Sequence, residues 1–167
     1  MSAKKPIVLV GAIVLVAAAI AAAAYVLSDG STKESPADVV GAAAVPSSED
    51  VIALGEKVYK SQCAICHGAN LEGQPNWRER KSDGRLPAPP HDETGHTWHH
   101  DDRTLFLLTK YGLARMTGQP IETDMPAYDG VLSDEEILAV LAYIKSQWPE
   151  QVRRRQAEIT ARAAAQR

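Results

Sequence analysis

The sequence predicts an all-α domain in which helices and long loops enclose a bound group, preceded by a single N-terminal transmembrane helix. An uncharged, apolar run of 21 residues, 7–27, lies near the N-terminus. Farther along, apolar residues recur at helical spacing on both sides of a segment rich in proline and glycine, 68–102. The chain has three Trp, five Tyr and one Phe, few for a core of side chains alone, which favours a bound group that completes it.

The first predicted element is the membrane-spanning helix over residues 7–27. With a rise of ~1.5 Å per residue, a helix of this length crosses the ~30 Å hydrocarbon core of a bilayer. Lys4 and Lys5 precede it, so the positive-inside rule places residues 1–6 in the cytoplasm and the rest of the chain on the far side. A cleaved secretory signal is the alternative, because residues 22–24 are alanines at a plausible cleavage site, and it also exports the domain.

Residues 28–47 are predicted to form a flexible linker, because Ser, Ala, Gly and Pro dominate without a sustained apolar period. A loop packed on the domain is the alternative. The domain that follows, 48–148, carries sixteen acidic and ten basic residues, whereas the tail, 149–167, carries five arginines and two glutamates. No basic stripe of a nucleic-acid-binding protein is present, so nucleic acid is not an expected partner.

Helical spacing predicts the first helix of the domain over residues 49–63, with one apolar face made by Val51, Leu54, Val58 and Tyr59. A short helix is predicted over residues 103–111 and a loop over 112–130. No convincing strand is found anywhere in the domain.

Ser133 and Glu136 form a capping box, which predicts a helix from there to about Gln147. Its buried face is expected to contain Ile137, Val140, Leu141 and Ile144. Pro149 then permits a new helical start, so residues 149–167 are predicted to be a basic helical tail.

The segment 63–67, CAICH, contains the candidate cofactor-binding residues. Cys63 and Cys66 are the only cysteines, and they are too close in sequence to form a disulfide framework. Two thiols at this spacing can add across the vinyl groups of a haem, which places His67 under the iron as an axial ligand. A thioredoxin-like redox pair would need a βαβ setting, and a zinc site would need a second pair of ligands. The prediction is therefore one covalently bound haem c.

The helix that runs into CAICHG and the later segment DMPAYDGVLSDEEILAVLAYIKSQWP make residues 48–148 resemble a monohaem class I cytochrome c of the membrane-anchored bacterial type. The resemblance implies the class I cytochrome c fold, with crossing N- and C-terminal helices, and an electron-transfer protein that is not an enzyme. It implies a haem domain on the periplasmic side of the bacterial inner membrane. Its partners would be membrane redox complexes: a donor of the quinol–cytochrome c reductase type and a terminal oxidase or other acceptor.

Met125 is the predicted sixth ligand of the haem iron, because cytochromes of this kind pair a histidine with a methionine thioether. The next residue, Pro126, restrains the backbone beside it. Met116, next to Thr117 and Gly118, is the second candidate, and either methionine could instead fill a gap in the core. An open or histidine-ligated iron is the remaining alternative.

Several residues of the middle segment are secondary candidates. The resemblance implies that Trp98 contacts a haem propionate and that a proline carbonyl accepts a hydrogen bond from the ligand imidazole; the candidates for that carbonyl are Pro87, Pro89 and Pro90. A histidine cluster surrounds Trp98, and it suggests either a loop beside the haem edge or a second metal or bis-histidine site: His91, His96, His99 and His100. Four cations precede it and could be solvated, neutralise propionates or dock an acidic partner: Arg78, Arg80, Lys81 and Arg85.

The predicted function is that of a single-electron carrier, tethered to the membrane and shuttling electrons between redox complexes. A fixed haem relay subunit of a larger oxidase or dehydrogenase complex is the first alternative. A haem sensor or peroxidase, which needs an open coordination site, is the second.

Overall fold

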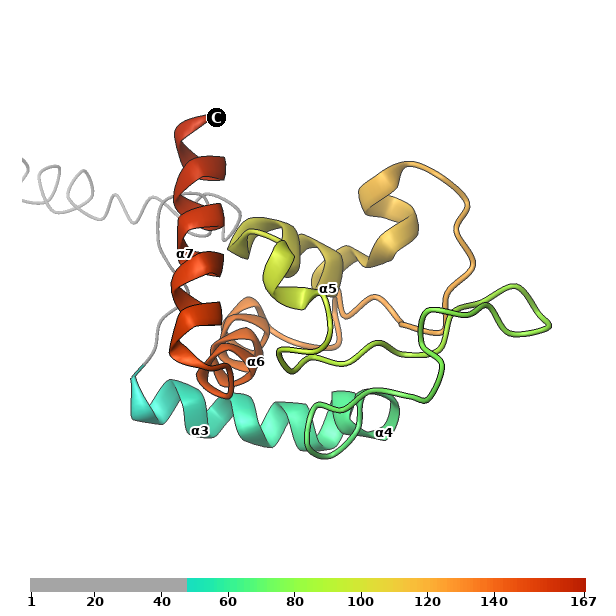
Figure 1. The fold of residues 1–167 in the computed structure, drawn as a ribbon, viewed down its shortest axis with the longest axis horizontal. Helices are drawn as coiled ribbons and strands as arrows, with labels where there is room; N and C mark the ends of the chain where they lie inside the picture. The colour runs from blue at the N-terminus through green and yellow to red at the C-terminus, as the bar shows by residue number, and fades with distance from the viewer. Residues whose placement is uncertain (1–47) are drawn as a thin grey trace, which may run out of the picture. The chain divides into compact units, whose positions relative to one another are not determined.

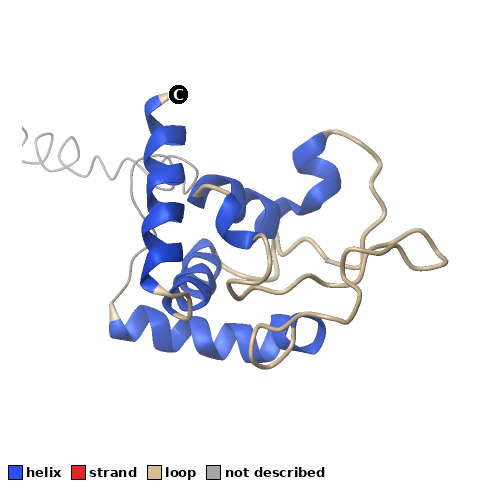
Figure 2. Ribbon diagram, viewed as in Figure 1, coloured by secondary structure: helices blue, strands red, loops and turns tan. Residues whose placement is uncertain are grey.

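The structure, a computed structural model, describes residues 48–167, and this part of the chain is helical without β-strands, as predicted (Figures 1 and 2). The elements are α3 (Glu49–Val58), the π-helical turn η1 (Tyr59–Cys63), α4 (Ala64–His67), the 3₁₀ turn η2 (Thr97–His99), α5 (Asp102–Thr117), α6 (Asp134–Ser146) and α7 (Glu150–Ala165). The predicted membrane helix, 7–27, and linker, 28–47, lie outside the described residues. Between residues 48 and 167, no helix combines the length and apolar character needed to cross a bilayer.

Two of the predicted helix starts are confirmed by their caps. The Val51 amide donates to the Ser48 hydroxyl (3.4 Å) at the start of α3. At the start of α6, the Glu136 amide donates to the Ser133 hydroxyl (3.2 Å), and the Ser133 amide donates to the Glu136 carboxylate (2.8 Å). The whole predicted face of α6 is buried: Ile137, Val140, Leu141 and Ile144.

Helices α3 and α6 cross in close contact at Gly55. A Cβ atom on Gly55 would lie 2.0 Å from the backbone oxygen of Ala139, so the two backbones meet without a side chain between them. One turn later Tyr59 packs against Tyr143 of α6, with ring centroids 5.5 Å apart. The crossing helices that the resemblance implies are therefore present.

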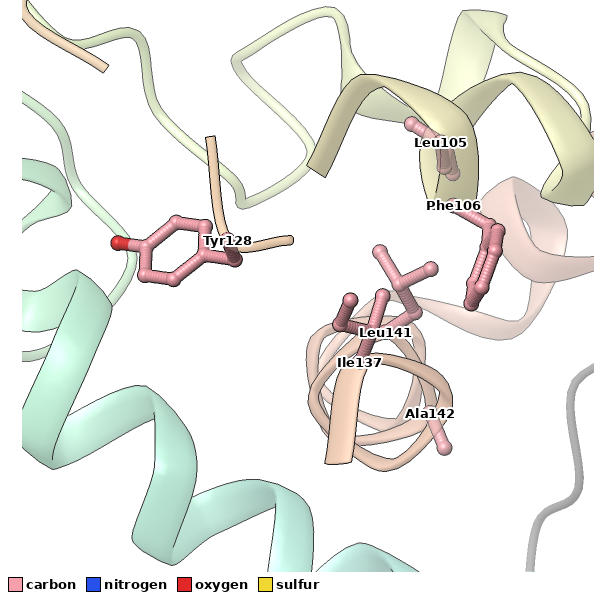
Figure 3. Close-up of a cluster of buried hydrophobic side chains, with 6 residues drawn as sticks. All are labelled: Leu105, Phe106, Tyr128, Ile137, Leu141 and Ala142. Atoms are coloured by element: carbon pink, nitrogen blue, oxygen red, sulfur yellow. The ribbon is translucent and has the colours of Figure 1, made fainter. Parts of the chain in front are cut away.

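A second part of the core joins α5 to α6 (Figure 3). Leu105 and Phe106 of α5 point toward Ile137 and Leu141 of α6. Phe106, the single phenylalanine of the chain, is 1% exposed. Tyr128 contributes to the same cluster from the loop before α6, so this loop is anchored in the core.

The loop predicted from Gly112 begins later than expected. A helix was expected over residues 103–111, and helical structure does break at Gly112, which adopts φ +76°, a conformation that favours glycine. A second helical segment then continues to Thr117, so the loop begins at Gly118. The predicted break is therefore present, and the short helical segment after it was not predicted.

The predicted basic tail forms α7 and is attached to the domain by a buried polar residue, Gln156, which is 0% exposed. Its Nε2 donates to Asp102 Oδ1 (2.6 Å) and to the His100 carbonyl (3.1 Å). Asp102 also accepts from Lys145 Nζ of α6 (2.7 Å), and its amide donates to Thr160 of α7 (3.1 Å). One buried carboxylate thus links α5, α6 and α7.

Replacing Gly55 should destabilise the protein, because any side chain there separates α3 from α6. We expect Gly55→Val to lower the free energy of unfolding by about 1–3 kcal/mol or more, measured by urea denaturation of the haem-loaded protein. Ala53→Val, at an exposed position of the same helix, should cost only about 0.6 kcal/mol. Helix propensity alone would make Gly55→Val slightly stabilising, because valine favours a helix more than glycine does, so a Gly55→Val protein no less stable than the parent would contradict the role of the crossing.

Removing the Gln156 amide should weaken the attachment of α7. We expect Gln156→Ala to cost about 1–3 kcal/mol of unfolding free energy, because Asp102 loses a buried donor. The control is Gln151→Ala on the exposed side of α7, which should stay within about 0.5 kcal/mol of the parent protein. A Gln156 variant as stable as this control would contradict the role of the buried network.

Candidate haem site

The CAICH segment occupies the end of a continuous helical path. Cys63 ends the π-helical turn η1, and Cys66 and His67 lie in α4. Residues three apart on a helix share a face, so both thiols are presented to the same side. Both are free, Cys63 half-buried and Cys66 exposed. Single π-helical turns are frequent at functional sites, and this one ends at the first cysteine of the CAICH segment.

The environment of Cys63 does not favour a reactive thiolate at that residue. Burial, and then the neighbouring Cys66, raise the pKa of the Cys63 thiol to about 11. Redox-active C-x-x-C pairs depend on a thiol whose pKa is lowered, so that the thiolate forms near neutral pH. Cys63 has the opposite environment, that of a half-buried neutral thiol.

His67 is 6% exposed, and a hydrogen bond from its ring orients it. Its Nδ1 lies 2.8 Å from the carbonyl oxygen of Pro89, which can only accept, so Nδ1 carries the proton. Burial lowers the pKa of His67, while the bond to Pro89 opposes this shift. The imidazole is therefore neutral, and the lone pair of Nε2 is available to a metal. Of the three prolines considered from the sequence, Pro89 is the one in contact.

Tyr59 supports the motif from inside the core, a role that the sequence analysis missed. Its hydroxyl donates to the carbonyl of Gly68 (2.8 Å) and lies 3.3 Å from that of His67. Burial raises the pKa of Tyr59 well above its ordinary value, so the hydroxyl remains a donor. The apolar face predicted for residues 49–63 included Tyr59, but periodicity alone gives no partner for its hydroxyl.

His91 lies against the face of His67. The two rings are stacked, with centroids 3.9 Å apart and an interplanar angle of 22°. His91 Nδ1 is 2.8 Å from the hydroxyl of Thr97, and the amide of His91 donates to the carbonyl of Leu71 (2.7 Å). Trp148 donates its indole N–H to the carbonyl of His91 (2.7 Å). His91 is thus held through its ring nitrogen and through both of its backbone polar groups.

Each of the other three histidines of the predicted cluster packs against a neighbouring ring. His96 stacks on Trp77, with centroids 5.8 Å apart, and forms an edge contact with His100 at 5.4 Å. His99 stacks on Trp98 at 3.7 Å. In the part of the chain that the structure describes, no three His, Cys, Asp or Glu side chains converge to hold a metal ion. The alternative of a second metal site therefore has no ligand set in these residues.

Trp98 makes its hydrogen bond within the protein. Its indole N–H donates to the carbonyl of Glu93 (3.1 Å), and Arg155 of α7 lies 5.3 Å from the ring centroid. The predicted propionate contact of Trp98 is not tested by these distances and stays a prediction.

The two candidate methionines are equally exposed, at 37% for Met125 and 36% for Met116. They differ in what surrounds them. The Met125 amide donates to the hydroxyl of Thr123 (3.1 Å), and the nearby Tyr128 hydroxyl donates to the carbonyl of Gln62 (3.0 Å), one residue before Cys63. The loop that carries Met125 is thus attached to the helix that carries the cysteines. Tyr128 is a second positioning residue that the sequence analysis missed.

These residues fit a covalently attached haem. Two free thiols lie one turn apart, and a buried imidazole next to them keeps Nε2 unprotonated. A thioether-bearing loop is attached to the same helix. The irregular segment around the motif is long for a small domain, and a bound group gives such loops a surface to pack on.

Removing the Tyr59 hydroxyl should destabilise the motif. We expect Tyr59→Phe to lower the free energy of unfolding of the haem-loaded protein by about 1 kcal/mol, because the partly buried Gly68 carbonyl loses its donor. Tyr143→Phe is the control, since the structure shows no hydrogen bond from that hydroxyl among residues 48–167. A Tyr59 variant no less stable than the control would exclude this bond as a support of the motif.

The comparisons with known proteins give one match. Residues 52–148, more than half of the chain, match the family model described as Cytochrome c. No curated protein and no solved structure matches the sequence. The chain therefore belongs to the cytochrome c family, whose members bind haem c covalently and carry electrons.

Proposed function

We propose that this chain carries single electrons on one haem c that is attached through Cys63 and Cys66, with His67 and Met125 as axial ligands. The observation that carries the proposal is the environment of His67: a nearly buried imidazole whose Nδ1 proton is held by the Pro89 carbonyl. Bound haem supplies reversible one-electron chemistry between ferric and ferrous iron.

The residues of the chain have separate tasks in this proposal. Cys63 and Cys66 hold the group as thioethers, and Pro89 fixes the tautomer and orientation of His67. Tyr59 and Tyr128 connect the motif to the crossing helices and to the methionine loop. An electron carrier breaks no bond in its substrate, so its site needs rigid, pre-organised ligands and no acid or base.

We further propose that residues 7–27 anchor the chain as a single-pass helix in the bacterial inner membrane, with the haem domain on the periplasmic side. The apolar run and the two lysines before it support this orientation. A tether through residues 28–47 raises the local concentration of carrier near its membrane partners. These would be redox complexes: a donor of the quinol–cytochrome c reductase type and a terminal oxidase or other acceptor.

Met125→Ala tests the axial ligand. We expect loss of the thioether-to-ferric-iron charge-transfer band, a lower reduction potential and new binding of CO to the ferrous protein, because the iron loses its sixth ligand. Met116→Ala is a control matched in residue type and exposure, and should retain the band and resist CO.

Two results would contradict the proposal. A band that survives in the Met125 variant and is lost in the Met116 variant would move the ligand to Met116. CO binding by the unsubstituted protein would favour a haem sensor or peroxidase with an open coordination site.

A further inference from the structure

Two loops far apart in sequence meet at Asp124, the residue before Met125. Lys81 Nζ lies 2.5 Å from Asp124 Oδ2, and Arg85 Nη1 lies 2.8 Å from Asp124 Oδ1. Arg85 Nε is also 3.9 Å from the Glu122 carboxylate. One carboxylate thus binds two cations from a loop about 40 residues earlier. Figure 1 shows the backbones of these two loops, green and orange, passing close to each other.

The loop that bears the cations is ordered by its own hydrogen bonds. The Lys81 amide donates to the Arg85 carbonyl (2.8 Å), and the Gly84 amide donates to the Lys81 carbonyl (2.9 Å). Arg80 Nη1 also donates to the Gly84 carbonyl (2.6 Å). This tight turn places both cations on one side, where they reach the same carboxylate.

The base of this loop lies next to the residue that orients His67. The Gln74 amide donates to the Ala88 carbonyl (2.8 Å), and the Ala88 amide donates to the Gln74 side chain (3.1 Å). The following residue, Pro89, accepts from His67. The loop therefore extends from the histidine side of the candidate site to the methionine side.

On the methionine side, few other contacts hold the segment before Met125. In the part of the chain that the structure describes, the hydrogen bonds made by residues 118–125 are local, apart from those to Lys81 and Arg85. Attachment to the core resumes only at Tyr128. Among the described residues, the polar contacts of this segment with a distant part of the chain are thus those to Lys81 and Arg85, the shortest of them at Asp124.

We propose that Lys81 and Arg85 are positioning residues that keep Met125 on the haem iron by holding Asp124. The proposal rests on Met125 as the sixth ligand. A methionine ligand dissociates when its loop moves away, and a tie on the adjacent residue reduces the freedom of the dissociated state. Exposed ion pairs are individually weak and are screened by salt, so the tie adjusts ligand affinity and does not set the fold.

The test is Asp124→Asn in the full-length, haem-loaded protein, with imidazole as a competing ligand for ferric iron. Imidazole at about pH 8 is mostly neutral, so removing the negative charge of Asp124 does not by itself change the electrostatic attraction of imidazole to the protein. We expect the variant to keep the thioether charge-transfer band and to bind imidazole about threefold more tightly. Raising the ionic strength should increase imidazole affinity in the unsubstituted protein and leave the variant nearly unchanged.

Two comparisons assign the effect to the ion pairs. Lys81→Gln should raise imidazole affinity when Asp124 is present and have little effect in the Asp124→Asn background. Glu56→Gln removes a comparably exposed ion pair with Lys60 on α3 and should leave imidazole affinity unchanged.

The charge-transfer band tests Met125 as the ligand, and the imidazole affinity tests the positioning role of Lys81 and Arg85. If the full-length protein shows the band but Asp124→Asn changes neither imidazole affinity nor its salt dependence, the positioning role is overturned and Met125 remains the ligand. A full-length protein without the band would overturn methionine ligation and the positioning role together.

Discussion

The close contact between Gly55 and the backbone of Ala139 is the constraint on which the rest of the domain depends. It brings α3 near enough to α6 for Tyr59 to pack against Tyr143 one turn later. That packing buries Tyr59, whose hydroxyl then meets the Gly68 carbonyl at the end of the cysteine motif. The position of the thiols and of His67 relative to the core therefore follows from a helix crossing that requires a residue without a side chain.

Loops complete the site, and each is anchored where it passes the motif. The carbonyl of Leu71 accepts from the His91 amide, the carbonyl of His91 accepts from Trp148, and Tyr128 reaches Gln62. Irregular segments of this length are costly to order in a small domain unless such contacts or a bound group compensate. A covalent haem in contact with these loops would account for both their length and the small number of aromatic residues.

Local patterns predicted the helices and the motif, because periodicity, caps and C-x-x-C-H spacing are short-range signals. The second segment of α5 was missed because the glycine that breaks the helix at residue 112 gives no local sign that helical structure resumes after it. The choice of Pro89 among three prolines, and the partners of Asp124, depend on how distant loops meet, which spacing does not encode. Gln156 was missed for another reason: a polar residue that is fully buried does not contribute to an apolar pattern.

The attachment of α7 fixes the position of the basic residues in 149–167 relative to the acidic domain, 48–148. The family match ends at residue 148, and the arginines that follow could belong to a free tail. Gln156 instead binds Asp102 and the carbonyl of His100, and Arg155 lies over Trp98. The positive charges are thus held at one side of an acidic domain by buried hydrogen bonds. A charge separation fixed in this way gives the domain a constant dipole, and such a dipole would orient the domain in any external electric field.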